Sequence, residues 1–135
     1  EAGLQDYAGI IGLGEAVNYL QKIGFKFIQE QEKQLNEYLS NGIADIPRLK
    51  ILGPADVHLR GGIVSFYLEG VDSHQIALML DQMGGILVRS GQHCVHSWFN
   101  AHSLSGSVRA SFYFYNTLSE AEIFVKQLRK IVKIL

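Results

Sequence analysis

Cys94 is the residue whose side chain is best suited to covalent chemistry, and it is the only cysteine among 135 residues. It belongs to residues 89–96 (RSGQHCVH), which follow a short apolar run at 86–88. The thiolate is the reactive form of cysteine, and a cationic neighbour such as Arg89 favours it. We predict that residues 86–88 form a buried strand and that Gly91 permits a sharp turn after it, because glycine tolerates positive φ. Loops that follow rigid strands often carry function, so residues 89–96 are a candidate reactive site.

Three interpretations of Cys94 are open from the residues alone. A zinc site with His93 and His96 is disfavoured, because structural zinc normally takes four nitrogen or sulfur ligands and this chain has one thiol. A buried, inert thiol is common in proteins, although the polar neighbours Arg89 and Gln92 argue against it here. A nucleophile agrees best with those neighbours, but a cysteine near a histidine is not a specific signal. The residues leave nucleophile and bystander equally open, and they predict no metal site.

Arg109 is the second candidate for chemistry. It lies within residues 108–113, where alternation predicts a strand with Val108, Ala110 and Phe112 on one face. An arginine in such apolar surroundings is costly unless it is paired. Its guanidinium group matches a carboxylate through two parallel hydrogen bonds. That carboxylate belongs either to a ligand or to one of the 13 acidic residues of the chain, and the sequence leaves both open.

Hydrophobic periodicity predicts the elements that position these side chains. Apolar residues at spacings of three and four predict helices at residues 9–23, 25–43, 73–83 and, after an N-cap at 117 or 119, from there to 135. Runs of β-branched and aromatic residues predict strands at 49–52, 62–68, 86–88 and 108–113. Residues 95–103 form either a short helix or an ordered loop. In this order the elements make one α+β domain, with a small sheet covered by helices on one side.

Composition excludes several classes of protein. Hydrophobic residues make up 47% of the chain and charged residues 19%, which is typical of a globular domain with a real core. A net charge of −1 gives no general attraction to nucleic acid or to an anionic membrane. No apolar run approaches the roughly 20 residues of a membrane span, and no signal peptide is visible. A single cysteine excludes an internal disulfide framework and fits a reducing compartment, so we expect a cytoplasmic protein.

Several motifs together resemble a known family. They are RSGQHC at residues 89–94, RAS at 109–111, YNT at 115–117, EAG at the start of the chain and GIIGLGEA at 9–16. In this order they resemble the C-terminal part of cysteine desulfurases, in the Suf-type, selenocysteine lyase-like branch of the class V aminotransferase superfamily. The resemblance covers all 135 residues. It implies the C-terminal small domain of a fold type I pyridoxal phosphate (PLP) enzyme, with a mostly antiparallel sheet, and we expect the cofactor-binding large domain to belong to a longer protein.

The resemblance also implies a function for that longer protein. Such enzymes use PLP to convert L-cysteine to L-alanine and leave the sulfur as a persulfide on a cysteine, whose position Cys94 occupies. Arg109 matches the arginine that binds the substrate carboxylate, and Arg89, His93 and Asn116 match residues that support the loop and its surroundings. Gly3 matches a residue near the cofactor phosphate of the partner subunit. The implied partners are a second copy of the enzyme and a sulfur acceptor, such as an iron–sulfur cluster scaffold protein.

Two departures from the family pattern affect this interpretation. Leu4 stands where the family has a threonine that contacts the cofactor phosphate. The cofactor lysine has no match, because none of the lysines lies in a His-x-x-Gly-Lys-like context. We therefore expect this chain alone to bind no PLP covalently and to be inactive. Selenocysteine lyase, which shares the framework, and a non-catalytic sulfur carrier or binding module remain as alternative functions.

Overall fold

The computed structural model describes residues 2–135, so Glu1, the first residue of the EAG motif, lies outside the described residues. The remaining chain forms five α-helices, one 3₁₀ helix and four strands within that range. Their order and bounds are α1 (Tyr7–Ile23), α2 (Phe25–Ile43), β1 (Leu49–Leu52), η1 (Val57–Leu59), β2 (Ile63–Leu68), α3 (Ser73–Gly84), β3 (Arg89–Gly91), α4 (His96–Ala101), β4 (Ser107–Ser111) and α5 (Leu118–Val132). None of the described helices is long and apolar enough to cross a membrane.

The four strands form one sheet in the order β1-β2-β4-β3, and every neighbouring pair is antiparallel. Alternation along the two central strands explains why one face is apolar. In β2 the side chains of Val64, Phe66 and Leu68 are buried, and in β4 those of Val108 and Ala110 are buried. The predicted α+β fold with a small antiparallel sheet is confirmed.

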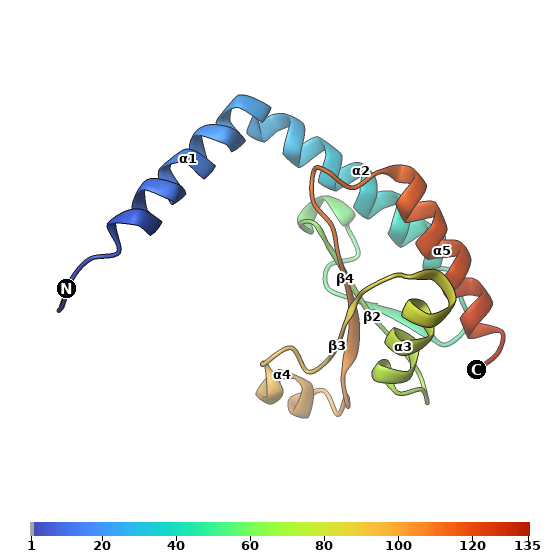
Figure 1. Cartoon of the computed structure of the whole chain (residues 1–135). Coiled ribbons are helices and arrows are strands. Elements are labelled where there is room, and N and C mark those ends of the chain that lie inside the picture. Colours follow the sequence, from blue (N-terminus) through green and yellow to red (C-terminus); the bar gives the residue numbers. More distant parts are fainter. Residues whose placement is uncertain (1) are drawn as a thin grey trace.

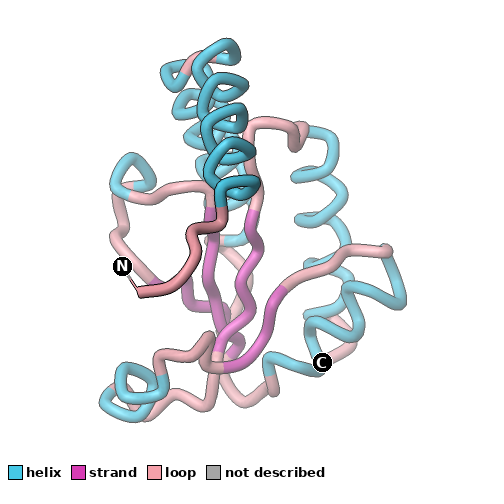
Figure 2. Tube along the Cα trace, turned by 60° about the vertical axis from the view of Figure 1, so that its left-hand side comes forward, coloured by secondary structure: helices cyan, strands magenta, loops and turns pink. Residues whose placement is uncertain are grey.

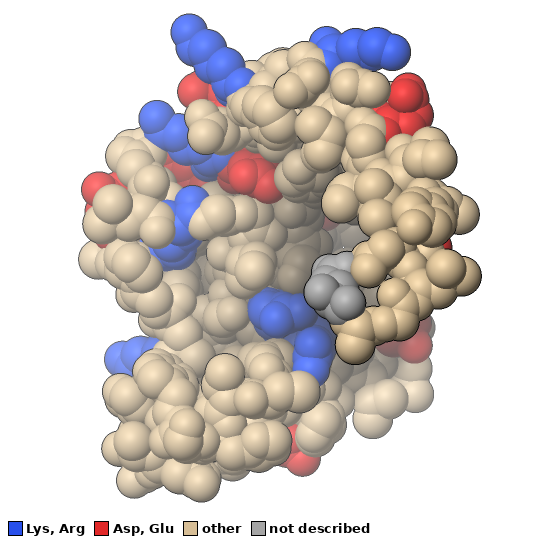
Figure 3. Space-filling view, turned by 90° about the vertical axis from the view of Figure 1, so that its left-hand side faces the viewer, with Lys and Arg blue, Asp and Glu red and all other residues tan. Residues whose placement is uncertain are grey.

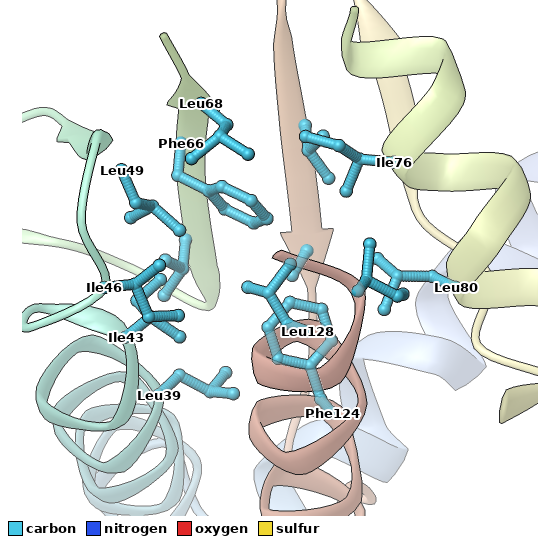
Figure 4. Packing of buried hydrophobic residues seen from close by; sticks show 14 of the residues in the cluster. Leu39, Ile43, Ile46, Leu49, Phe66, Leu68, Ile76, Leu80, Phe124 and Leu128 are labelled. Carbon is cyan, nitrogen blue, oxygen red and sulfur yellow. The ribbon is translucent and has the colours of Figure 1, made fainter. Parts of the chain in front are cut away.

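Helices α2, α3 and α5 cover this apolar face, and the strands run through the middle of the molecule (Figures 1 and 2). Figure 4 shows how the three helices and β2 direct their side chains into one core. The rings of Phe66 in β2 and Phe124 in α5 meet edge to face, with centroids 6.3 Å apart. Leu128 of α5 and Ile76 of α3 are fully buried beside them. A core of this kind fixes the sheet, and the sheet in turn positions the strand ends.

Helices α3 and α5 both begin at side-chain caps, and the cap of α5 lies at residue 117, one of its two predicted positions. Asp72 caps α3 by accepting a hydrogen bond from the backbone of His74, and Gly85 ends that helix in a left-handed conformation. Thr117 and Glu120 form a capping box at the start of α5. The backbone N–H of Thr117 donates to the Glu120 carboxylate and holds its pKa below the ordinary value. These caps fix where both core helices begin.

Helix α1 differs from the others because it extends away from the rest of the chain (Figure 1). It begins two residues earlier than predicted, since Asp6 caps it by accepting from the backbone of Gly9. None of its residues is buried in the structure of residues 2–135. Its apolar stripe is exposed, with Leu13 at 66% and Val17 at 42%. A single residue, Gly24, ends α1 and precedes α2, at a φ of 93° that only glycine adopts readily.

One predicted strand is wrong. Residues 86–88 are not a strand, and the strand in this region is β3, which begins at Arg89. Ile86 and Val88 still pack against the core, while Leu87 is 83% exposed. Pairing with β4 starts only where Arg89 lies opposite Arg109. An apolar run can bury its side chains without forming ladder hydrogen bonds, so hydrophobicity placed the strand three residues too early.

Candidate active site around Cys94

Cys94 lies on a tight turn between β3 and α4. The backbone N–H of Val95 donates to the carbonyl of Gln92 at 2.9 Å and closes the turn. His93 and Cys94 both have left-handed backbone conformations, with φ values of 51° and 63°. Gly91 has the positive φ that the sequence predicted, 103°, but it is the last residue of β3 and the turn follows it. Left-handed backbone costs a residue other than glycine about 1–2 kcal/mol, so the turn depends on contacts from the rest of the fold. This turn leaves the thiol of Cys94 exposed.

Arg89 contacts the thiol directly. Its Nη2 atom donates a hydrogen bond to Cys94 Sγ, with a distance of 3.5 Å between the two atoms. The geometry follows from the strand, because Arg89 is the first residue of β3 and the turn brings Cys94 back toward it. A guanidinium group in this position is complementary to a sulfur atom that carries negative charge. The contact favours the nucleophile among the three interpretations of Cys94.

Arg109 lies opposite Arg89 in the β3–β4 pair. Directly opposite residues of antiparallel strands point to the same face, so the two guanidinium groups share one side of the sheet. Neither forms an ion pair with an acidic residue in the described part of the chain. Its Nε atom is buried and has no hydrogen-bond partner among residues 2–135. An unpaired, half-buried cation of this kind is complementary to an anionic ligand.

His93 holds the cysteine turn to the sheet. Its Nε2 atom lies 2.9 Å from the hydroxyl of Ser107, the first residue of β4, and its ring packs near Phe99 of α4. Burial of the ring lowers the pKa of His93 below its ordinary value, and the charges of Arg109 and Arg89 lower it further. The imidazole is therefore neutral at neutral pH. A neutral ring beside two cations suits a structural anchor.

Asn116 lies in the turn between β4 and α5 and connects this turn to two helices, α2 and α5. Its side chain accepts from the backbone N–H of Tyr113 at 2.9 Å and donates to Glu120, while its carbonyl accepts from Gln31 of α2. Gly3 lies at the other extreme, before α1, with a φ of 91° and no atom within 4 Å of the place a Cβ would take. The structure thus brings Arg89, His93 and Cys94 into contact with one another or with β4, and it leaves Gly3 in the segment that precedes the extended helix.

Two polar partners of this site were not identified from the sequence. His74 is exposed, and it places its Nδ1 atom 2.8 Å from the hydroxyl of Ser90 in β3. Ser107, the partner of His93, is fully buried. His74 and Ser90 are 16 positions apart along the chain, so no local pattern could reveal the contact. Ser107 lay outside the predicted strand, and alternation does not indicate burial for it because its neighbour Val108 is buried as well.

The thiol of Cys94 is exposed at the surface and is not enclosed in a cavity. An apolar cavity of 340 Å³ lies between the segment before β3 and the start of α5, but Cys94 and the two arginines are not part of its lining. On the face shown in Figure 3, acidic and basic side chains are mixed, and basic side chains gather beside a central hollow. Among residues 2–135, no three His, Cys, Asp or Glu side chains are close enough to hold a metal ion.

Comparison with known proteins connects this geometry to one family. The family model described as aminotransferase class-V matches residues 1–124. A probable cysteine desulfurase of Synechocystis sp. is 40% identical over 134 residues, which is 98% of this chain and 32% of the relative. The cysteine desulfurase of Serratia proteamaculans is 36% identical and is matched over 100% of this chain and 32% of its own length. The chain thus spans about a third of the curated relatives that it matches.

Solved structures agree with this result. The apo cysteine desulfurase of Thermococcus onnurineus superposes on the whole chain with a TM-score of 0.92 at 36% sequence identity, and the match covers 33% of that structure. The Escherichia coli cysteine desulfurase CsdA, in an S-sulfonic acid form, gives a TM-score of 0.88 at 26% identity and is covered to 33%. The agreement extends over all described elements, including α1.

Proposed function

We propose, from the premise that this chain belongs to the class V aminotransferase family, that it is the part of a cysteine desulfurase that carries the sulfur-accepting cysteine. The observation that carries the proposal is that the thiol and the two arginines lie together at the adjacent strands β3 and β4. An exposed thiol on a left-handed turn receives a hydrogen bond from Arg89, and Arg109 lies opposite Arg89 with its Nε buried and unpaired among the described residues. Relatives named cysteine desulfurase that are 36–40% identical support the same assignment.

The proposed reaction converts L-cysteine to L-alanine. The Cys94 thiolate attacks the sulfur of bound L-cysteine, so that an S–S bond forms and the C–S bond breaks. The electron pair of that bond stays on the substrate carbon, which takes up a proton and leaves as L-alanine. Sulfur remains on Cys94 as a persulfide. Pyridoxal phosphate, when bound, supplies the electron sink for cleavage of the C–S bond.

The residues of this chain have distinct roles in the proposal. Arg109 binds the substrate carboxylate and thereby fixes the position of the substrate sulfur. Arg89 stabilises negative charge on the sulfur of Cys94 through its Nη2 contact. His93 anchors the turn to Ser107 of β4. The exposure of Cys94 lets a sulfur acceptor, such as an iron–sulfur scaffold protein, reach the persulfide.

The cofactor would be held almost entirely outside this chain. Gly3 is the one described residue that we assign to it, because its open backbone lets a phosphate approach the N–H group. Leu4, which is 94% exposed, offers no hydroxyl for that contact. We therefore assign the cofactor lysine and the other cofactor contacts to a large domain of a longer protein, with this chain as its C-terminal small domain. The exposed apolar stripe of α1 supports this arrangement, because another surface must cover it.

Dimerisation and location complete the proposal. In a homodimer Gly3 would lie near the cofactor phosphate of the partner subunit. A reducing compartment such as the cytoplasm suits the reaction, since Cys94 must be a free thiol to accept sulfur. The chain alone should be inactive.

The test uses the full-length protein with PLP and L-cysteine, with alanine and sulfide as products to be measured. Cys94→Ala should abolish sulfur transfer. Arg109→Ala should raise the KM for cysteine about 10- to 100-fold, the effect of losing a charge-assisted hydrogen-bonded pair. Arg48→Ala is the matched control, because Arg48 is an exposed arginine before β1. Full activity of Cys94→Ala, or an unchanged KM for Arg109→Ala, would refute the assigned roles.

Two alternatives are separated by related experiments. Selenocysteine lyase predicts a faster rate on selenocysteine than on cysteine when both are measured side by side. A sulfur carrier is also compatible with the exposed thiol of Cys94. It predicts that the chain alone forms a persulfide from an external donor, and that the longer protein shows no PLP absorbance.

A further inference from the structure

Strand β3 presents the cysteine turn, yet it has few contacts of its own. It is three residues long and lies at the edge of the sheet, so within residues 2–135 it pairs with β4 alone. Such a short edge strand forms few ladder hydrogen bonds. The turn that follows adds left-handed backbone at His93 and Cys94. Other contacts must therefore fix where β3 places the thiol.

Two histidine–serine pairs provide these contacts, one on each side. On the side of α3, His74 Nδ1 lies 2.8 Å from the hydroxyl of Ser90, the central residue of β3. On the side of β4, His93 Nε2 lies 2.9 Å from the hydroxyl of Ser107. The first pair holds the strand before the turn, and the second holds the turn itself. A serine hydroxyl both donates and accepts, so each pair can form with either tautomer of the ring.

The backbone around His74 is itself fixed. Asp72 caps α3 by accepting from the backbone N–H of His74, which places the ring at the first turn of a core helix. The ring also packs close to Gly91, since a Cβ at Gly91 would lie 3.4 Å from His74 Cε1. Gly91 in turn lies against Gly106, where an added Cβ would come within 3.1 Å of the Gly91 backbone. His74 is thus an exposed residue whose backbone is capped by Asp72 and whose ring lies beside the end of β3.

We propose that His74 is a positioning residue for Cys94. It acts through Ser90, holding β3 so that the turn keeps the Cys94 sulfur against Arg89, and the His93–Ser107 pair holds the turn from the other side. This inference rests on the proposed function for its effect on catalysis. Its effect on the thiol itself does not depend on that function.

The experiment uses the full-length protein with its cofactor bound and has two readouts. The first is the rate at which iodoacetamide alkylates Cys94. The second is the pair kcat and KM for L-cysteine. Ser90→Ala and His74→Phe each remove the hydrogen bond, and each should slow alkylation about three- to tenfold, because the sulfur moves away from Arg89. Each should lower kcat by a similar factor with little change in KM, because Arg109 still binds the carboxylate.

Conservative variants separate positioning from general damage to the fold. Ser90→Thr keeps the hydroxyl and His74→Asn places an amide near the position of Nδ1, so both should retain at least half of the parental alkylation rate. His58→Phe, an exposed histidine on η1, is the control for loss of a surface imidazole. The double variant His74→Phe/Ser90→Ala should be no worse than either single variant, since both remove the same bond.

Parental alkylation and parental kcat in Ser90→Ala would overturn the proposal. Additive effects of His74→Phe and Ser90→Ala would overturn it as well, because they would show two unrelated contributions. If Ser90→Ala fails to fold, the comparison of His74→Phe with His74→Asn decides the matter by the same readouts. If the protein proves not to be a desulfurase, the alkylation rates still test the positioning of the thiol, so the two failures are distinguishable.

Discussion

Helices α1 and α5 have the same kind of apolar stripe in their sequences, but the stripe of α5 is buried and that of α1 is exposed. In α5 the apolar stripe of Ala121, Phe124, Leu128 and Ile131 is buried in the core. In α1 the stripe predicted from the same spacing is exposed, with Leu13 at 66%. Periodicity thus predicts that a helix has an apolar face, but it does not say what covers that face. For α5 the covering surface lies within this chain, and for α1 we propose that it lies in the rest of a longer protein.

The two helices also differ in what stabilises them. Helix α5 has a capping box and a core contact along its length. Helix α1 has a single cap from Asp6 and no buried residue among those described. Most helical stability in proteins comes from packing of an apolar face, and isolated helices of this length are marginal in water. The energies of matched substitutions in the two helices should therefore be very different.

The largest difference is expected for one leucine in each helix. Leu128→Ala should lower the free energy of unfolding by about 2–5 kcal/mol, because it leaves a cavity in the core. Leu13→Ala in the same chain should change it by less than about 0.5 kcal/mol, because nothing covers that side chain. Urea unfolding followed by circular dichroism measures both. Equal losses from the two substitutions would show that α1 is packed against this chain in solution.

The second prediction moves the same substitution into the full-length protein. If another domain covers α1, Leu13→Ala should there cost about 1.5–3 kcal/mol, the value of burying a leucine side chain. Unfolding of the longer protein, with and without the change, measures it. Lys22→Ala, at the polar end of α1, is a control that should have little effect. A result for Leu13→Ala as small as in the short chain would contradict the proposed arrangement.

Removing the N-cap of each helix should give a smaller difference in the free energy of unfolding than the leucine substitutions do. Thr117→Ala removes the cap of α5 and should lower the free energy of unfolding by about 1 kcal/mol. Asp6→Ala removes the cap of α1 and should reduce helical signal without moving the unfolding midpoint, since α1 does not share in the core. Thermal unfolding at two wavelengths, far-ultraviolet for helix and near-ultraviolet for the core, separates the two outcomes.

The smallest expected effect depends on pH and concerns the sheet end rather than either helix. Burial and two arginines lower the pKa of His93 below its ordinary value of 6.5. Below that pH the unfolded chain binds more protons than the folded chain, so this contribution is complete above pH 6.5 and is lost as pH falls toward the folded pKa. His93→Gln should lose less stability than the parent between pH 7.5 and 5.5, as measured by urea midpoints. An identical decline in both proteins would exclude His93 as the cause.

Sequence alone predicted much of this fold. The stripes of α2 and α5 are local patterns that the structure confirms, and of the two predicted cap positions of α5 it selects Thr117. The α+β arrangement followed from the order of those elements. Strand β3 was misplaced because Ile86 and Val88 bury their side chains without pairing, which hydrophobicity cannot distinguish from a strand.

The candidate site was predicted in part. The positive φ of Gly91 agrees with the sequence analysis, whereas the turn itself lies at residues 92–95 and the exposure of Cys94 was not predicted. The structure added the contact of Arg89 with the sulfur and the alignment of Arg89 with Arg109, both of which require knowledge of the strand register. The roles of these residues in catalysis stay predictions. His74 was missed because its partner is remote in sequence, and such contacts are set by packing rather than by spacing.

A small rotation of the backbone at Gly24 produces a large displacement at the far end of α1. Helix α1 has 17 residues and, at the standard rise, is about 26 Å long. A rotation of about 10° at the one glycine that joins α1 to α2 moves the far end of α1 by roughly 4–5 Å. If α1 packs on a large domain, as we propose, the same rotation would instead move the sheet and the thiol of Cys94. A sulfur atom must come within about 3–3.5 Å of its target to react. The backbone torsion angles of Gly24 would therefore set how the thiol of this chain aligns with a substrate held by the large domain.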